Sequence, residues 1–266
     1  MKKTIRRIAP VALVLLGLAT LSFTANEGIT LKLQPQKGKS YTINVKNTSM
    51  NIMEVMGQTQ NQSQTIETRQ SFTVKDVNEN QSTLETQIEA VKMSISAGGM
   101  KLEYDSEHPE KTSPMLAGQT AEFDKVLNKP ATVAYDAQGE FVGDAADLEM
   151  NQLSNVIIKL PTEELTVGSK WTDEKTQNMS GTGEIKVNME YTVTAISKKS
   201  VDVSYDGKIN SEEATGSISG TASINPQTGL VMTRSEKENL SMTISQQGLS
   251  IPVTMAANTT VTLTEK

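Results

Sequence analysis

The feature that most constrains the fold of this chain is the alternation of apolar and polar residues with a period of two. The clearest run has apolar residues at every second position from Ile185 to Ala195, with polar residues between them. Similar runs lie at residues 41–45, 66–74, 100–104, 201–205, 240–244, 249–257 and 261–263. Because successive side chains of a strand point to opposite faces, this pattern predicts many strands with one buried face. Short turns between the runs favour one large antiparallel sheet.

In one run the phase of the alternation changes. The apolar positions are even-numbered from Leu84 to Ala90 and odd-numbered from Val91 to Ile95. A slip of one residue would carry the second set to the polar face, so a β-bulge near Ala90 and Val91 is expected. Bulges bend strands, which favours a curved sheet or an incomplete β-barrel over a flat sheet.

Two segments depart from the strand pattern and predict amphipathic helices packed on the sheet. Ser113-Pro114 supplies an N-cap and an N1 proline for a helix over residues 115–127. Asp144 is suited to cap a second helix, which Pro161 ends. The apolar stripes comprise Leu116, Phe123, Val126 and Leu127 in the first helix, and Leu148, Leu153, Val156, Ile157 and Leu160 in the second. The expected fold class is mainly β (α+β).

Two sequence patterns occur twice and indicate an internal duplication. Gly38-Lys-Ser-Tyr41 resembles Gly168-Ser-Lys-Trp171, and the turn Asp136-Ala-Gln-Gly139 resembles Asn225-Pro-Gln-Thr-Gly229. An early Asp or Asn and a late Gly are typical of turns between strands, so chance likeness of hairpins is the alternative. We expect one β-rich domain over residues 26–266, with a first half at about 29–143, a helical connection at about 144–160 and a second half at about 161–266.

Residues 1–25 have the three parts of a secretory signal peptide. A basic start is followed by an apolar run at residues 8–21 and by small residues up to Ala25. The run is shorter than the ~20 residues that cross a bilayer, so cleavage near Ala25 is favoured over an uncleaved membrane anchor. No later segment is apolar for long enough to span a membrane as a helix. The predicted location is the periplasm or the cell surface of a Gram-negative-type bacterium.

The cysteine content and the net charge limit which modifications and binding partners the chain can have. The chain has no Cys, so it has neither a disulfide nor a thiol that could carry a lipid at the mature N-terminus. Without the four basic residues of the leader, 21 of the 25 basic residues face 31 acidic ones, a balance of about −10. An acidic surface repels phosphate backbones, which argues against nucleic acid as a partner.

Catalytic patterns are weak. The single histidine, His108, is flanked by Asp105, Glu107 and Glu110, a setting typical of a solvated turn rather than a metal or acid–base site. Thiol catalysis is excluded, and the scattered carboxylates leave only a hydrolase with two distant acids as an alternative. The sequence therefore predicts a non-enzymatic protein with no catalytic residue, metal ligand or cofactor.

Methionine is the residue type that points to a ligand. Met50, Met53 and Met56 are spaced by three, and thioethers bind Cu(I), but in a strand this spacing puts Met53 on the opposite face. Packing is therefore favoured over a copper site. Elsewhere Met recurs at inward-facing positions, where its flexible thioether adapts to varied apolar guests or fills an ordinary core. The residues expected to line a ligand site are Met93, Met100, Met189, Tyr191, Met242, Met255, Phe123 and Leu153.

The order of several motifs carries a family resemblance. Leu102-Glu-Tyr104-Asp-Ser106, the segment 115–130, the turn at 136–142 and Val167-Gly-Ser-Lys-Trp171 follow one another along the chain. Together they resemble a family of exported β-rich proteins of unknown function that is common in Bacteroides-type bacteria. The expected architecture is also similar to the periplasmic lipoprotein-carrier (LolA/LolB-like) fold, an incomplete barrel that shelters acyl chains. This second likeness concerns architecture alone.

These observations lead to three hypotheses. The first is an exported, non-catalytic binding protein that holds an apolar or amphipathic, lipid-like ligand in the concave face of the sheet. The second is an envelope scaffold or assembly component that binds another envelope protein. The third is a carboxylate-dependent hydrolase.

Overall fold

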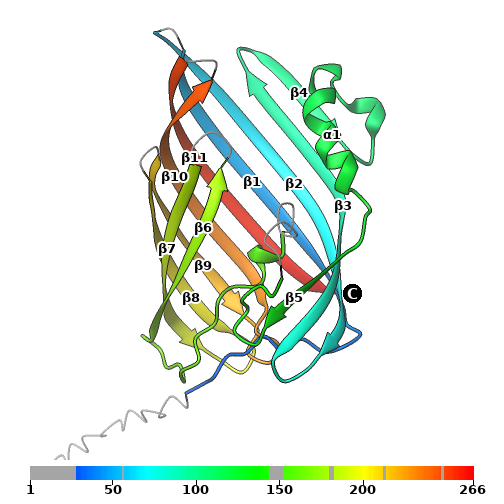
Figure 1. The fold of residues 1–266 in the computed structure, drawn as a ribbon, viewed down its shortest axis with the longest axis vertical. Coiled ribbons are helices and arrows are strands. Elements are labelled where there is room, and N and C mark those ends of the chain that lie inside the picture. Colours follow the sequence, from blue (N-terminus) through cyan, green and yellow to red (C-terminus); the bar gives the residue numbers. More distant parts are fainter. Residues whose placement is uncertain (1–27, 56, 144–151, 180–182, 212–213, 247–248) are drawn as a thin grey trace, which may run out of the picture.

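The structure is a computed structural model that describes residues 28–55, 57–143, 152–179, 183–211, 214–246 and 249–266. A single antiparallel sheet of 11 strands dominates it, as the alternation predicts (Figure 1). The strands are β1 (Ser40–Val55), β2 (Gln58–Val77), β3 (Gln81–Ala97), β4 (Met100–Asp105), β5 (Ala131–Asp136), β6 (Lys170–Met179), β7 (Gly183–Ile196), β8 (Val201–Asn210), β9 (Ala214–Ile224), β10 (Val231–Gln246) and β11 (Leu249–Glu265). The mainly β fold is thus confirmed.

The sheet curls into a barrel that is not closed. Its order is β4-β3-β2-β1-β11-β10-β9-β8-β7-β6, and β5 pairs with the start of β3, in line with β4. β1 pairs with the last strand, β11, so the first and last strands lie side by side in the middle of the sheet. The edges formed by β6 on one side and by β4 and β5 on the other are not paired with each other. We call the gap between these edges the seam.

The expected bulge in β3 is present. The β2–β3 register runs from Arg69↔Ala90 to Gln70↔Ile88, which leaves Glu89 as the extra residue. On either side of it Ile88 and Val91 are both buried, as the change of phase requires. The sequence therefore located this irregularity to within one or two residues.

One end of the barrel, the closed end, is filled by chain segments that lie inside the sheet. Residues 29–33 and 152–165 supply this filling, which we call the plug, and they pack against the concave face of the strands (Figure 1). The plug contributes Leu31, Leu33, Leu153, Val156, Ile157, Ile158, Leu160 and Leu165, each at most 3% exposed. Its backbone is hydrogen-bonded to neighbouring strands and turns, since buried amides need partners. For example, Val231 N–H donates to the Val156 carbonyl at 2.9 Å.

The two sequence repeats adopt matching structures. The N–H of Gly38 donates to the Val74 carbonyl at 2.8 Å, and the N–H of Gly168 donates to the Val193 carbonyl at the same distance. Both glycines have positive φ, 84° and 91°. In both copies the register of the following strand pair shifts directly after that valine.

Aromatic packing and turns extend the correspondence. Tyr41 stacks on Phe72 with ring centroids 4.9 Å apart, and Trp171 stacks on Tyr191 at 5.0 Å. The turns at Asp136 and Asn225 are both held by the side-chain oxygen of that residue and end in a glycine of positive φ. The series β1-β2-β3-β5 therefore corresponds to β6-β7-β8-β9. The repeat seen in the sequence is a structural repeat.

The helical expectation is only half met. The first helix is present as a 3-10 turn, η2 (Pro114–Leu116), that continues into α1 (Ala117–Val126), after η1 (Pro109–Lys111). It packs over a second apolar cluster on β3 and β4 that includes Met93 and Tyr104. The second amphipathic helix is not confirmed. Residues 144–151 lie outside the described part, and residues 152–160 contain only the short η4 (Gln152–Asn155).

The two amphipathic helices are thus reduced to one among the described residues. Val156, Ile157 and Ile158 are consecutive and all buried. A helix packed on a sheet cannot bury three successive residues on one face, so this apolar segment is irregular and buried on all sides. No described helix has the length and apolar character needed to cross a bilayer.

Candidate functional site

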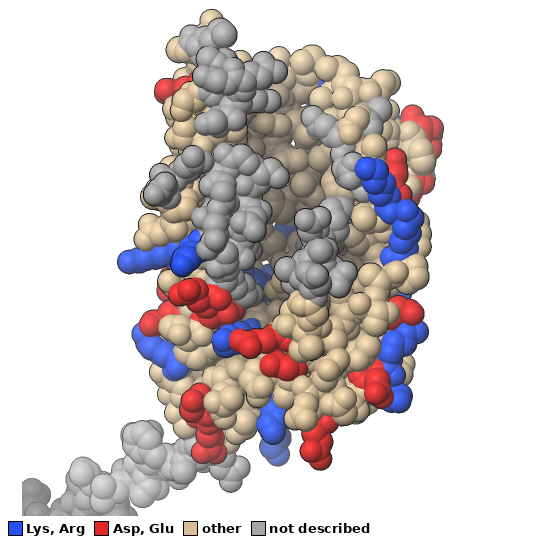
Figure 2. Space-filling model, in the orientation of Figure 1, with Lys and Arg blue, Asp and Glu red and all other residues tan. Residues whose placement is uncertain are grey.

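The concave face of the sheet is divided at about its middle. Towards the closed end the plug covers it, and the aromatic rings of Trp171, Tyr191 and Tyr205 pack side by side there. Beyond these rings no described residue of the plug covers the wall, and α1 covers only its side on β3 and β4. Figure 2 shows the molecule hollowed between the two edges of the sheet. These three rings, together with the charged side chains of Arg234 and Glu236 next to them, therefore form the floor of a hollow.

A largely buried ionic network lies at this floor. Arg234 of β10 donates from Nε to the Tyr205 hydroxyl at 2.8 Å, and that hydroxyl donates to Glu236 Oε2 at 3.0 Å. Arg234 Nη2 also pairs with Glu236, and its guanidinium carbon lies 5.0 Å from the Tyr205 ring centroid. The charges of Arg234 and Glu236 therefore satisfy each other, as burial requires.

A glycine makes this contact feasible. In register, Tyr205 of β8 lies opposite Gly220 of β9, and Gly220 lies opposite Glu236 of β10. The Tyr205 side chain crosses over Gly220 to reach the charges, and a Cβ at that position would collide with its hydroxyl. Burial raises the pKa of Tyr205, and Arg234 acts in the opposite direction. Burial alone would lower the pKa of Arg234, yet the carboxylate of Glu236 raises it overall.

Glu238 is the next residue along the same face of β10. Its direct neighbours in register are Ala257 of β11 and Ile218 of β9, and Leu240 follows it on the strand. Burial raises the pKa of its carboxyl, and the negative charge of Glu236 adds to the effect. Among the described residues, no hydrogen bond or ion pair is made by the Glu238 carboxylate. An acid that has no partner among the described residues thus lies just beyond the floor.

Apolar side chains continue the wall from Glu238 towards the far end. Those on β9, β10 and β11 that share its face and are only partly buried are Ile218, Met242, Ile244, Ile251 and Met255. Partial exposure of such residues on a concave surface is typical of ligand-binding clefts rather than of a closed core.

The neighbouring part of the wall, on β1 and β2, is polar. Asn47, Asn51, Gln62 and Gln64 face the same side, since they alternate with convex residues in register. Asn47 Nδ2 donates to Thr259 Oγ1 at 2.9 Å, and Gln64 Nε2 contacts the sulfur of Met93 at 3.4 Å. The hollow is therefore amphipathic, with an apolar wall and an amide wall side by side.

The predicted lining residues are dispersed over this architecture. Met242 and Met255 lie on the apolar wall of the hollow, partly buried. Met93 and Phe123 belong to the cluster beneath α1, and Met100 is 58% exposed at the β3–β4 hairpin. Met189, Tyr191 and Leu153 are at most 4% exposed in the core at the closed end. The structure thus brings Met242 and Met255 together on the apolar wall, while Met93 borders the amide wall through its contact with Gln64.

The charged residues of the floor were missed by the sequence reasoning. Arg234, Glu236 and Glu238 continue, in phase, the alternation of Leu240, Met242 and Ile244. That phase was the available signal. The phase alone does not place these residues on the concave side, because charged side chains are mostly exposed in folded proteins.

The other expected motifs fall as follows. Met50 is 56% exposed on the convex face and Met53 faces the concave side, so the predicted split of the Met-x-x-Met spacing is confirmed, whereas Met56 lies outside the described residues. His108 has its Nδ1 3.3 Å from Glu110 at an exposed turn. Within the described residues no group of three or more acidic or His side chains is arranged to hold a metal ion.

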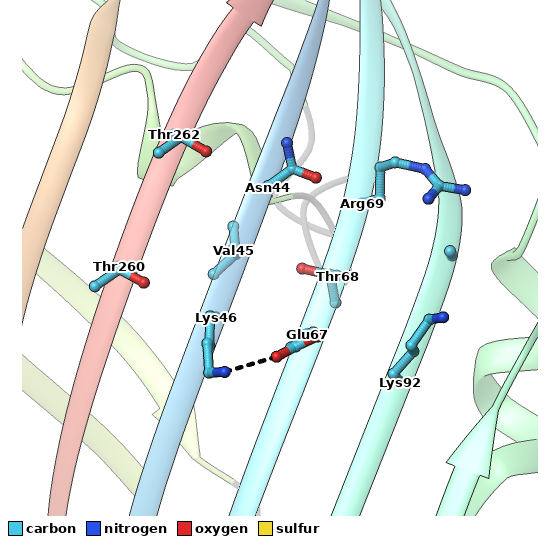
Figure 3. Close-up of a pocket in the computed structure, with 10 residues that line it drawn as sticks. Asn44, Val45, Lys46, Glu67, Thr68, Arg69, Lys92, Thr260 and Thr262 are labelled. Atoms are coloured by element: carbon cyan, nitrogen blue, oxygen red, sulfur yellow. Dashed lines mark ion pairs between the residues drawn. The ribbon is translucent and has the colours of Figure 1, made fainter.

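The convex face carries a shallow groove of about 290 Å³ across β11, β1, β2 and β3 (Figure 3). Lys46 and Glu67 pair across it at 2.8 Å, and Thr260 and Thr262 line one side. Its polar side chains are partnered or solvated, so it is a less suitable ligand site than the hollow.

Comparison with known proteins gives a family match over part of the chain. Residues 149–231 match DUF6263, which is described as a family of unknown function. The matched stretch contains the whole plug segment 152–165 and the second copy of the repeat, β6 to β9. The expected resemblance to a family of unknown function is confirmed over these residues, while the Bacteroides-type distribution and the lipoprotein-carrier likeness stay predictions. No curated protein matches the sequence significantly.

Solved structures resemble the chain only distantly. A lipovitellin structure, described as showing lipid–protein interactions, is 13% identical to this chain, with a TM-score of 0.48. The match covers 86% of this chain and 25% of the lipovitellin chain. A putative AttH protein from Nitrosomonas europaea is 12% identical with a TM-score of 0.19, covering 84% and 51% of the two chains. The translocator domain of the autotransporter NalP from Neisseria meningitidis is 8% identical with a TM-score of 0.24, covering 86% and 90%. The chain thus spans about a quarter of the lipovitellin chain and about half of the AttH chain.

Proposed function

We propose that this protein is an exported binding protein that holds an apolar or amphipathic guest in the hollow of the open barrel. The observation that carries the proposal is the half-covered concave face: the plug fills only the closed end, and beyond the floor apolar side chains remain partly exposed. Leaving such a surface in water is unfavourable by about 25 cal/mol for each Å² of apolar area, and a guest would remove that cost.

The composition of the wall supports a guest of variable shape. Met242 and Met255 are flexible and polarisable, which suits a site that adapts to different chains. The adjacent amide side chains offer donors and acceptors to a polar headgroup. An amphiphile would satisfy both walls at once.

The first test is the chain without residues 1–25, purified without detergent and extracted for mass spectrometry. We expect co-purified amphiphiles in an amount comparable to the protein. A second measurement uses a neutral naphthylamine dye whose fluorescence rises in apolar surroundings. Met255→Gln on the wall should weaken dye binding roughly three- to tenfold, because it removes part of the ~1.5–3 kcal/mol gained by burying such a side chain.

The matched control is Thr254→Gln, at the adjacent, exposed position on the convex face of the same strand. It should bind the dye as the parent chain does. Equal affinity of both variants and the parent, or no dye binding at all, would contradict the proposal. Export is tested separately by expressing the whole chain in a Gram-negative host and measuring the intact mass of the product. We expect a mass that corresponds to a start near Asn26.

A further inference from the structure

We infer that Glu238 forms a headgroup subsite in the hollow and selects amphiphiles that carry a protonated amine. This inference rests on the proposed function and specifies its ligand class. Its basis is the position of one acidic side chain between a satisfied ionic network and an apolar wall.

The first step is that Glu236, the other acid on this face of β10, already has hydrogen-bond and ion-pair partners. Glu236 accepts from the Tyr205 hydroxyl at 3.0 Å and pairs with Arg234, so a ligand cation would have to compete with the guanidinium. Glu238, two residues further, makes no hydrogen bond or ion pair with any described residue. On the concave face of β10, the acid without a partner among the described residues is therefore Glu238.

The second step concerns charge. The groups facing Glu238 on its own strand are Glu236 and Arg234, and the nearest polar group from β8 is the Tyr205 hydroxyl. Its neighbours on β9 and β11, Ile218 and Ala257, carry no charge. The concave face of β10 thus carries one cation and two acids when Glu238 is ionised, and Asp173 of β6 adds another acid near Tyr191, so acids outnumber cations and a cationic ligand group suits the site.

The third step is spatial. Glu238 lies where the floor meets the apolar wall of Ile218, Leu240 and Met255, so an amine bound there has its chain directed along partly exposed apolar residues. Burial of the carboxyl raises its pKa, which means that the ionised form is poorly solvated and gains from a cationic partner. An ammonium donates up to three hydrogen bonds, and those that Glu238 does not accept can go to water in the hollow.

The test compares dodecylamine, dodecanol and dodecanoic acid as competitors of the neutral dye at pH 7, each below the concentration at which it aggregates or separates from solution. The three differ in headgroup and share one chain length. We expect dodecylamine to bind at least tenfold more tightly than dodecanol, and dodecanoic acid to bind most weakly. Glu238→Gln should abolish the preference for the amine and leave the affinity for dodecanol within about twofold.

The matched control is Glu67→Gln, which removes an acid from the convex face of β2 and should keep the full amine preference. Circular dichroism checks that each variant is folded. If dodecanol and dodecylamine bind equally well, or if the preference survives in Glu238→Gln, the inference fails while the proposed function stands. If none of the three competitors binds, the proposed function fails with it.

A measurement on the unaltered protein provides an independent check. Because a protonated Glu238 cannot pair with an ammonium, the amine preference should disappear as the pH falls through the range in which this carboxyl takes up its proton. Dodecanol affinity should stay constant over the same range. An amine preference that persists at pH 3 would overturn the inference.

Discussion

At the scale of single residues, the floor depends on the absence of a side chain at Gly220. An added methyl group there would meet the Tyr205 hydroxyl and the backbone carbonyl of Ser235. Gly220→Ala should therefore lower the free energy of unfolding by about 1–3 kcal/mol, the usual cost of overpacking. Urea unfolding followed by circular dichroism measures the change.

Gly118→Ala is the control for this substitution. Gly118 lies in α1 with nothing within 4 Å of the added group, and its backbone is already helical. Replacement by Ala should be neutral or raise the free energy of unfolding by about 0.5–1 kcal/mol, since Gly is a poor helix former. A Gly220→Ala variant as stable as Gly118→Ala would show that the Tyr205 contact can relax freely.

Individual residues were predictable from the sequence only where neighbours along the chain defined them. The separation of Met50 from Met53 follows from strand geometry alone. The contact between Tyr205 and Glu236 does not, because it depends on the register of three strands joined by two turns. The same holds for Glu238, whose environment is formed by Ala257 and Ile218, its neighbours on the adjacent strands.

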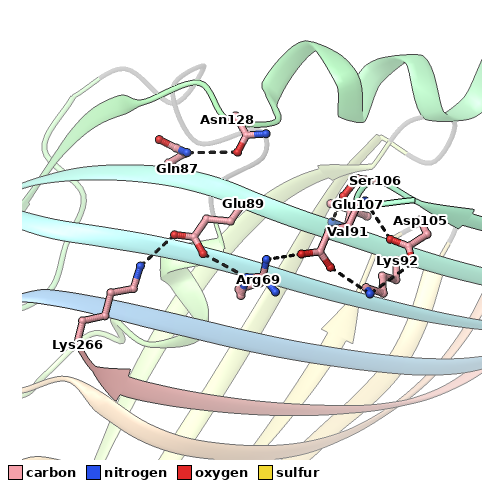
Figure 4. A network of polar contacts seen from close by, with 10 residues as sticks. All are labelled: Arg69, Gln87, Glu89, Val91, Lys92, Asp105, Ser106, Glu107, Asn128 and Lys266. Carbon is pink, nitrogen blue, oxygen red and sulfur yellow. Dashed lines mark hydrogen bonds and ion pairs between the residues drawn. The ribbon is translucent and has the colours of Figure 1, made fainter. Parts of the chain in front are cut away.

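At the scale of secondary-structure elements, an ionic network ties strands together on the convex face (Figure 4). Glu107, in the turn after β4, accepts from Arg69 at 2.7 Å and pairs with Lys92 at 3.1 Å. Arg69 and Lys266 both pair with Glu89, the bulge residue of β3. The bulge thus directs a carboxylate outward, where it joins β2, β3 and the C-terminal strand.

This network gives the protein a pH-dependent stability. The hydrogen bond from Arg69, and then that from Lys92, lowers the pKa of Glu107 to about 2 from its usual 4.5. A depressed carboxyl pKa stabilises the fold above the unfolded value, and this contribution is lost as the pH falls from about 4.5 to 2. Glu107→Gln should therefore lower the melting temperature at pH 7 and flatten its fall over that acid range.

Glu79→Gln provides the comparison, since Glu79 is an exposed acid in the β2–β3 turn. Glu79→Gln should leave the fall of the melting temperature in acid as it is in the parent chain. Added salt should reduce the difference between Glu107→Gln and the parent, because exposed ion pairs are screened. A parental pH profile in Glu107→Gln would contradict the assignment.

The elements themselves were predictable where the signal is local and periodic. The strands, the bulge, the helix after Ser113 and the paired turns at Asp136 and Asn225 all follow from short patterns. The described part of the second predicted helix, residues 152–160, is not helical beyond η4, and its apolar residues fit a helical stripe only if the equally buried Ile158 is left out. A plug is defined by what surrounds it, and that surrounding comes from strands distant in sequence.

At the scale of the whole molecule, the division between a filled and a hollow half predicts a gradient of local stability. Residues 41–45 of β1 face the plug and the core, whereas residues 51–55 of the same strand lie beyond the floor. Hydrogen exchange should therefore be slower in the first stretch, because local opening is more costly where more apolar contacts are made.

Hydrogen exchange followed by mass spectrometry on peptides from both ends of β1 and β11 measures this gradient. Adding an amphiphile that binds should increase protection at residues 51–55 and leave residues 41–45 nearly unchanged. Uniform exchange along β1 would contradict the division, and a uniform response to the amphiphile would place the guest elsewhere.

The seam between β6 and the β4–β5 edge has a mechanical consequence. In a closed barrel the number of strands and their stagger fix the radius, so a wider guest can enter only by breaking hydrogen bonds between strands. Here the circumference is interrupted, and a small change in the twist of each strand pair widens the bore without the loss of any ladder hydrogen bond. The largest diameter of a guest that fits inside is therefore set by the elasticity of the sheet rather than by its number of strands.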